Sequence, residues 1–93
     1  MNFVFNEPSA HYLGLHEDPM TLNELSLGKH ACITAVGGQG AFRRRLLEIG
    51  LLPGTTVCRT GQAPLGDPLS FRVRGAIVTL RREDAQRVEV EPA

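Results

Sequence analysis

The chain lacks several of the side chains on which common binding sites are built. Its 93 residues include no tryptophan and a single tyrosine, Tyr12. In the part that we expect to fold, the aromatic residues are Phe42 and Phe71, both at positions expected to face inward. Readers of single-stranded nucleic acid stack bases on exposed aromatic rings, and polyproline readers need an aromatic-lined groove. Neither mode of recognition is therefore expected.

Cysteine and long apolar runs are also scarce. The two cysteines, Cys32 and Cys58, form no CxxC motif and are too few for a disulfide framework, so we expect them to be reduced. No apolar run approaches the roughly 18 residues of a membrane span. The first residues have no basic region followed by a long apolar segment, as a secretory signal would. We expect a cytoplasmic protein with no direct membrane insertion.

Neither sign of charge is in excess. Ten basic and ten acidic residues give a net charge of zero, which argues against a dedicated nucleic-acid binder. The charges are unevenly placed, however. Residues 1–24 contain four acids and no lysine or arginine, whereas residues 43–87 contain nine arginines and four acids. A cationic surface is therefore expected on the second part of the chain.

Motifs of the common enzyme classes are missing. We find no GxSxG, HExxH or Walker A pattern. The stretch "GGQG", residues 37–40, precedes an expected helix, but it lacks the Lys-Ser/Thr pair of a phosphate-binding loop. We interpret it as a turn and expect no enzymatic activity.

The hydrophobic periodicity predicts a mainly β domain. Residues 1–20 show no clear period and are expected to be an irregular N-terminal extension, with the domain at 21–91. Strands are expected at 30–36, 55–60, 69–74, 76–80 and 87–91. A helix is expected at 41–49 and a short helical turn at 81–85. This order predicts a small SH3-like β-barrel with one α-helix after the first strand and a short helical turn before the last.

Alternation within the strands predicts which side chains face inward. In 30–36 we expect Ile33 and Val36 to lie on opposite faces of the strand. In 69–74 the inner residues are expected to be Leu69, Phe71 and Val73. Three strand arginines are expected to face outward and add to the cationic surface: Arg59, Arg72 and Arg74.

The end of the helix carries the clearest local signals. The expected apolar stripe is Phe42, Leu46 and Ile49, widened by Leu47. Gly50 suits the left-handed residue that follows a helix, and Pro53 prevents its continuation. Pro53 and Gly54 together suit the centre of a type II turn.

Three adjacent arginines, Arg43, Arg44 and Arg45, lie on this helix. Adjacent helical positions are about 100° apart, so these side chains spread over the polar side. Arg44 can pair with Glu48 at i, i+4 for a few tenths of a kcal/mol. Three interpretations stay open: a solvated face, a partner-docking surface and contact with nucleic acid.

Metal binding is a further open alternative. The stretch "HYLGLHED" places two imidazoles and two carboxylates close together, namely His11, His16, Glu17 and Asp18. No spacing typical of a structural metal site appears. These residues are either solvated or bind Zn²⁺ or Fe²⁺ opportunistically, and we expect no required cofactor.

Four ordered segments resemble the ferrous iron transport protein A (FeoA) family between Leu22 and Val90. They are "LNELSLGKHACITAV", "RRRLLEIGLLPGTTV", "APLGDPLSFRVRG" and "AIVTLRREDAQRVEV". The family pattern RL-x-E-x-G-x-x-PG, then PLGDP, then LR-x-x-x-A, falls on Arg45-Leu46, Glu48, Gly50, Pro53-Gly54, Pro64 to Pro68, and Leu80-Arg81 to Ala85. Each motif alone is weak, but the ordered set is specific.

The resemblance implies an SH3-like barrel in the bacterial cytoplasm with a non-enzymatic accessory role in ferrous iron uptake. The implied partner is the large membrane permease of that system, which carries a cytoplasmic G-protein domain. The helix 41–49 and the loop 61–68 are the expected docking elements. We expect electrostatic orientation from Arg43, Arg44, Arg45 and Glu48.

Apolar anchors and loop-shaping residues complete the expected docking surface. The anchors are Leu51, Leu52 and Leu65 if they are exposed, although Leu51 and Leu52 are as well suited to the core. Loop shape is expected to depend on Pro64, Gly66, Asp67 and Pro68. The alternatives are a metal-responsive regulator using the histidines of residues 1–20 and a nucleic-acid-binding barrel.

Overall fold

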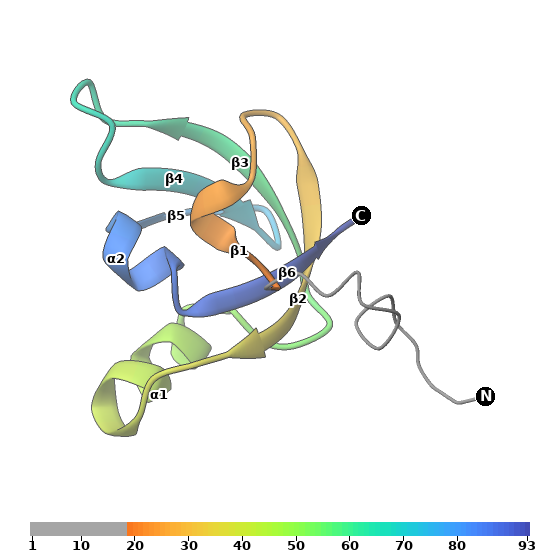
Figure 1. The fold of residues 1–93 in the computed structure, drawn as a ribbon, viewed down its shortest axis with the longest axis vertical. Helices are drawn as coiled ribbons and strands as arrows, with labels where there is room; N and C mark the ends of the chain where they lie inside the picture. The colour runs from red at the N-terminus through yellow and green to blue at the C-terminus, as the bar shows by residue number, and fades with distance from the viewer. Residues whose placement is uncertain (1–18) are drawn as a thin grey trace, which may run out of the picture.

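The computed structural model describes residues 19–93, and the predicted extension therefore lies almost wholly outside the described residues. Six antiparallel strands form one curled sheet in the order β1-β6-β2-β3-β4-β5 (Figure 1). Their bounds are Met20–Thr21 (β1), His30–Val36 (β2), Thr56–Gln62 (β3), Leu69–Val73 (β4), Ala76–Leu80 (β5) and Val88–Pro92 (β6). The mainly β, SH3-like fold class is confirmed.

Three helical segments complete the fold. They are the 3₁₀ turn η2 (Leu22–Glu24), the helix α1 (Gly40–Glu48) and the short helix α2 (Arg82–Ala85). The two-residue strand β1 and η2 were not expected, so α1 follows the second strand of the chain and not the first. A Thr-x-x-Glu signal was present at Thr21, whose backbone N–H donates to Glu24 Oε1 at 2.8 Å. Two residues are too few for a periodicity signal, which is why β1 escaped prediction.

The core lies inside the curl of the sheet. It consists of the inward residues of all the longer strands, capped by Leu46 of α1 and by Leu22 of η2. Alternation in β4 is confirmed, because Leu69, Phe71 and Val73 are buried while the residues between them are not. The inward side chains of the strands, Leu46 of α1 and Leu22 of η2 thus belong to one core.

The prediction that Val36 lies on the face opposite the buried Ile33 is wrong. Its side chain is only 6% exposed, because the register of β2 against β6 shifts between Ile33 and Ala35. The extra residue, Thr34, reverses the alternation for the rest of the strand. A bulge of this kind depends on the partner strand and gives no sign in the strand's own sequence.

The end of α1 has the geometry that the sequence predicts. Gly50 has φ of +107°, and its N–H donates to Leu47 O at 3.1 Å. The next N–H, of Leu51, donates to Leu46 O at 3.2 Å, which completes a Schellman motif. The following turn is type II, with Gly54 at φ +91° and a hydrogen bond from Thr55 N to Leu52 O.

Arg59 is not on the outer surface, contrary to the prediction. It is 8% exposed, and its guanidinium donates to Leu25 O at 2.8 Å and to Gln62 Oε1. The register of β3 against β4 shifts just after it, between Arg59 and Gly61. The guanidinium therefore ties the segment after η2 to the end of β3.

Candidate partner-docking surface

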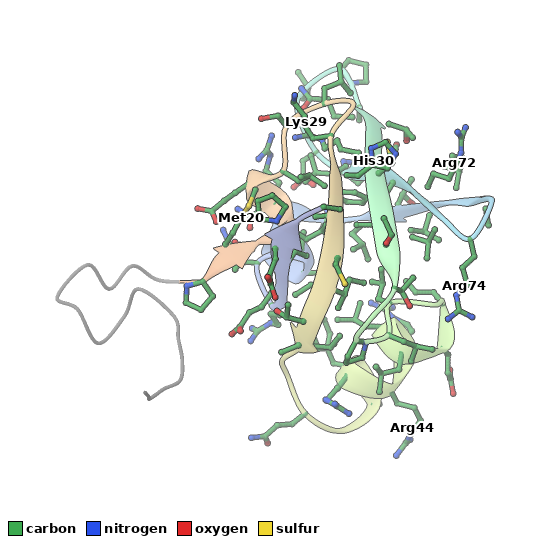
Figure 2. All side chains as sticks on the ribbon, turned by 90° about the vertical axis from the view of Figure 1, so that its right-hand side faces the viewer. Met20, Lys29, His30, Arg44, Arg72 and Arg74 are labelled. Atoms are coloured by element: carbon green, nitrogen blue, oxygen red, sulfur yellow. The ribbon has the colours of Figure 1, made fainter. Side chains whose placement is uncertain are left out.

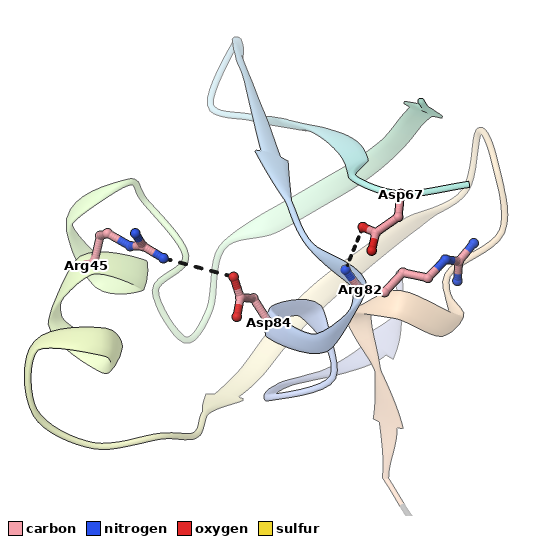
Figure 3. Close-up of polar contacts among 4 residues, drawn as sticks. All are labelled: Arg45, Asp67, Arg82 and Asp84. Atoms are coloured by element: carbon pink, nitrogen blue, oxygen red, sulfur yellow. Dashed lines mark hydrogen bonds and ion pairs between the residues drawn. The ribbon is translucent and has the colours of Figure 1, made fainter. Parts of the chain in front are cut away.

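The short helix α2 lies between the two elements that we expected to dock. In Figures 1 and 3, α1 lies on one side of α2 and the loop 63–68 on the other. Arg45 of α1 approaches Asp84 of α2 at 4.0 Å, and Asp67 Oδ1 of the loop accepts the backbone N–H of Arg82 at 2.9 Å (Figure 3). These contacts join helix, loop and α2 into one surface, which we call the α1–α2–loop surface.

The loop 63–68 is held by backbone and side-chain hydrogen bonds. Arg82 Nε donates to Gly66 O at 2.8 Å, and Ala63 N donates to Pro68 O at 2.9 Å across the loop. The Asp67–Pro68 peptide is cis. The hydrogen bonds constrain the loop, and Leu65 lies at its tip, where it is 98% exposed.

The three helix arginines differ in their contacts. Arg43 Nε donates to Val36 O at 3.0 Å, which ties α1 to the end of β2. Arg45 has its exposed ion pair with Asp84. Arg44 has no hydrogen bond or ion pair within residues 19–93, and the expected pairing with Glu48 is not formed there. Arg44 is thus the member of the run that is most available to a partner.

The expected apolar anchors differ in how exposed they are. Leu51 is fully buried and belongs to the core, because the Schellman motif turns it back against the helix. Leu51 is therefore not accessible to a docking partner. Leu52 is 36% exposed, and Leu65 is the most exposed of the large apolar side chains described.

Sequence reasoning missed one part of this surface. Ile49 was expected on the inner stripe of the helix, yet it is 38% exposed. It lines an open groove of about 400 Å³ between α1 and the end of β5, together with Arg45, Pro68, Thr79, Arg81 and Asp84. The i, i+7 spacing from Phe42 predicted that Ile49 faces the core. Because the helix ends at Glu48, the helical spacing no longer applies to Ile49.

The metal candidates are not tested by this geometry. His11, His16, Glu17 and Asp18 lie outside the described residues. Within residues 19–93 no three His, Cys, Asp or Glu side chains are grouped as metal ligands would be. His30 and Cys58 are direct cross-strand neighbours, and both cysteines are free thiols.

Fold and surface together define a small SH3-like domain in which α1, α2 and the loop 63–68 are joined by polar contacts. The chain belongs to the FeoA domain family, whose model matches residues 20–92. The family is linked to ferrous iron transport as an accessory and is not a known enzyme family. None of the helices described in residues 19–93 is long and apolar enough to cross a membrane.

Three relatives illustrate the family match. An "Fe(2+) transport protein A/Fe(2+) transporter FeoB fusion protein" of Porphyromonas gingivalis is 47% identical over 72 residues, which are 77% of this chain and 8% of the fusion protein. The FeoA protein of Chlorobium tepidum has 38% identity and a TM-score of 0.74, covering 78% of this chain and 70% of its own.

The FeoA protein of Stenotrophomonas maltophilia adds a metal to the comparison. It is 36% identical with a TM-score of 0.68, and the match covers 77% of this chain and 89% of that one. Its crystal structure holds zinc, and it is described as a prokaryotic SH3 domain protein and a candidate ferrous iron transport activating factor.

Proposed function

We propose that this chain is a cytoplasmic, non-enzymatic accessory protein of bacterial ferrous iron uptake that acts by docking on a FeoB-type permease. The observation that carries the proposal is the Porphyromonas gingivalis relative, in which FeoA and FeoB are joined in one protein. Domains that are fused in one organism have to function side by side there. The fusion therefore supports an association of this chain with a separate FeoB-type permease.

The α1–α2–loop surface is the proposed docking site. Leu65 provides an apolar anchor on a constrained loop, so little conformational entropy is lost when a partner covers it. Arg44 is exposed on α1 and makes no hydrogen bond or ion pair within residues 19–93, so it is free to steer a partner of opposite charge. The anchor should mainly set the dissociation rate, and the arginine should mainly set the association rate.

The test is the binding of the full chain to the cytoplasmic G-protein domain of its cognate permease, with and without a GTP analogue. Leu65→Ser should weaken binding at least roughly tenfold, while its melting temperature stays that of the wild type. Arg44→Glu should slow association and reduce its salt dependence. Lys29→Glu is the matched charge reversal, because Lys29 and Arg44 lie at opposite ends of the molecule (Figure 2). Equal affinities of all three variants would contradict this docking site.

A second candidate function is a metal-responsive regulator. It is favoured by the zinc held in the Stenotrophomonas maltophilia relative. The candidate ligands of this chain are His11 and His16 with the neighbouring carboxylates, as solvated or opportunistic sites for Zn²⁺ or Fe²⁺. Calorimetry of the wild type and of His11→Ala/His16→Ala with zinc decides the matter. Equal and negligible heats would remove the metal-binding role.

A further inference from the structure

The strand β5 is an open edge of the sheet. It pairs with β4 from Leu69↔Leu80 to Val73↔Ala76, and it is the last strand in the sheet order. Among residues 19–93, no strand pairs with its other side. An edge of this kind carries a row of unpaired backbone groups that can template another strand.

The outward backbone groups of β5 can be assigned from the hairpin. The turn Arg74–Gly75 has φ of +52° and +83°, as in a type I′ turn, so Val73 and Ala76 form the first hydrogen-bonded pair. Pairs alternate along an antiparallel ladder, and the N–H and C=O of Ile77 and Thr79 therefore point away from β4. Neither residue has another backbone hydrogen bond in the described chain.

The side chains of β5 do not protect this edge. The segment "AIVTL" has no charge, no proline and three β-branched residues, and its pairing with β4 has no bulge. Ile77 is 54% exposed on the outer face, whereas Val78 packs partly against the core. Natural edges usually carry one of the protective features that are missing here.

Charge decides which strand can pair with it. The hairpin 69–81 contains Arg72, Arg74 and Arg81 and no acid. Figure 2 shows Arg72 and Arg74 on the side where this hairpin projects from the molecule. A second copy of this hairpin would bring three further arginines and no acid against the first set, so repulsion between like charges opposes self-pairing. The arginines thus oppose self-pairing and favour an acidic strand.

We propose that β5 accepts an extended acidic segment of another protein as an added antiparallel strand. Backbone hydrogen bonds to Ile77 and Thr79 supply affinity. Alternation supplies specificity, because every second side chain of the added strand lies on the outer face with Ile77 and Thr79. The positive charges of Arg72 and Arg81 favour carboxylates at these positions. The intervening side chains point toward Val78 and should be apolar. Thr79 and Arg81 also line the groove beside Ile49 and Asp84, so the added strand would lie next to the α1–α2–loop surface. The inference itself stands on β5 and holds whether or not the partner is a permease.

The test uses a peptide of matching chemistry, acetyl-Thr-Val-Glu-Val-Glu-Val-Thr-amide, titrated into the full chain and followed by amide-resolved NMR. We expect saturable shifts centred on Ile77 and Thr79, with slowed hydrogen exchange of these two amides in the complex. The same peptide with lysine in place of glutamate should bind at least roughly tenfold more weakly. Shifts centred elsewhere, or equal binding of both peptides, would overturn the proposal.

Two variants separate strand addition from general charge attraction. Thr79→Pro removes an outward N–H without loss of a β4–β5 hydrogen bond, and proline is tolerated at such edge positions. It should abolish peptide binding while the wild-type spectrum persists outside the hairpin. Arg72→Glu/Arg81→Glu keeps the edge but reverses the charge, so preference should switch to the lysine peptide. Retained glutamate-peptide binding by either variant would contradict the proposal.

Discussion

Gly50 is a single residue on which the direction of the chain after α1 depends. Its φ of +107° costs an L-residue about 1–2 kcal/mol, and an added Cβ would lie 3.4 Å from Val73 Cγ1. We expect Gly50→Ala to lower the free energy of unfolding by about that amount, as measured by urea denaturation. Gly61→Ala is the control, since Gly61 has no positive φ and open space around it. Equal effects of the two substitutions would show that backbone conformation is not the cause.

Arg59 makes a contact that a shorter cation cannot reproduce. Its planar guanidinium donates to Leu25 O and to Gln62 Oε1 at once while 92% of the residue is buried. We expect Arg59→Lys to lower the free energy of unfolding by about 1–2 kcal/mol, because a buried acceptor loses its donor. Arg72→Lys, on the next strand and exposed, should change it by less than about 0.5 kcal/mol. An Arg59→Lys variant as stable as the wild type would contradict this structural role of the Arg59 guanidinium.

At the scale of the element, α2 depends on a cap that comes from the loop. Its own N-cap, Arg81, makes no side-chain cap hydrogen bond, and Asp67 Oδ1 accepts from Arg82 N instead. We expect Asp67→Ala to cost about 1 kcal/mol and Asp67→Asn to cost less, because asparagine keeps an acceptor. Thermal unfolding of both variants measures this difference. Equal losses would indicate that the charge, and not the hydrogen bond, holds the loop.

The helices and most strands were predictable from local pattern alone. The helix end at Gly50, the type II turn after Pro53 and the alternation of β4 follow from backbone geometry and from a period of two. The predictions failed where a neighbouring element decides the outcome. Val36 turned inward through a bulge against β6, and Arg59 turned inward to reach Leu25 O, a residue 34 positions earlier.

At the scale of the whole molecule, the sheet order predicts a gradient of stability. The strands β2 and β3 lie in the middle of the sheet and have partners on both sides, whereas β5 has one. Hydrogen exchange should therefore be slowest in the central strands. Within β5 we expect Val78 to exchange at least about a hundredfold more slowly than Ile77 and Thr79, since its N–H points to β4. Uniform exchange along β5 would contradict the assigned hydrogen-bond pattern.

The candidate docking surface shows the same division between local and tertiary information. The loop itself was predictable, because "PLGDP" marks a turn, whereas the full exposure of Leu65 within it is a result of the structure. The contacts of α2 with both α1 and the loop were not predictable. They join Arg45 to Asp84 and Asp67 to Arg82, which are 39 and 15 positions apart in the sequence.

The sequence by itself determined the class of fold, the ends of the helix and the family, because these depend on local periodicity, on backbone preference at glycine and proline, and on ordered motifs. The tertiary structure alone decided which arginines are structural, that Leu51 belongs to the core, and that β5 is left as an open edge. Each of those outcomes depends on which elements pack against one another, and that is set when the sheet closes around its buried side chains.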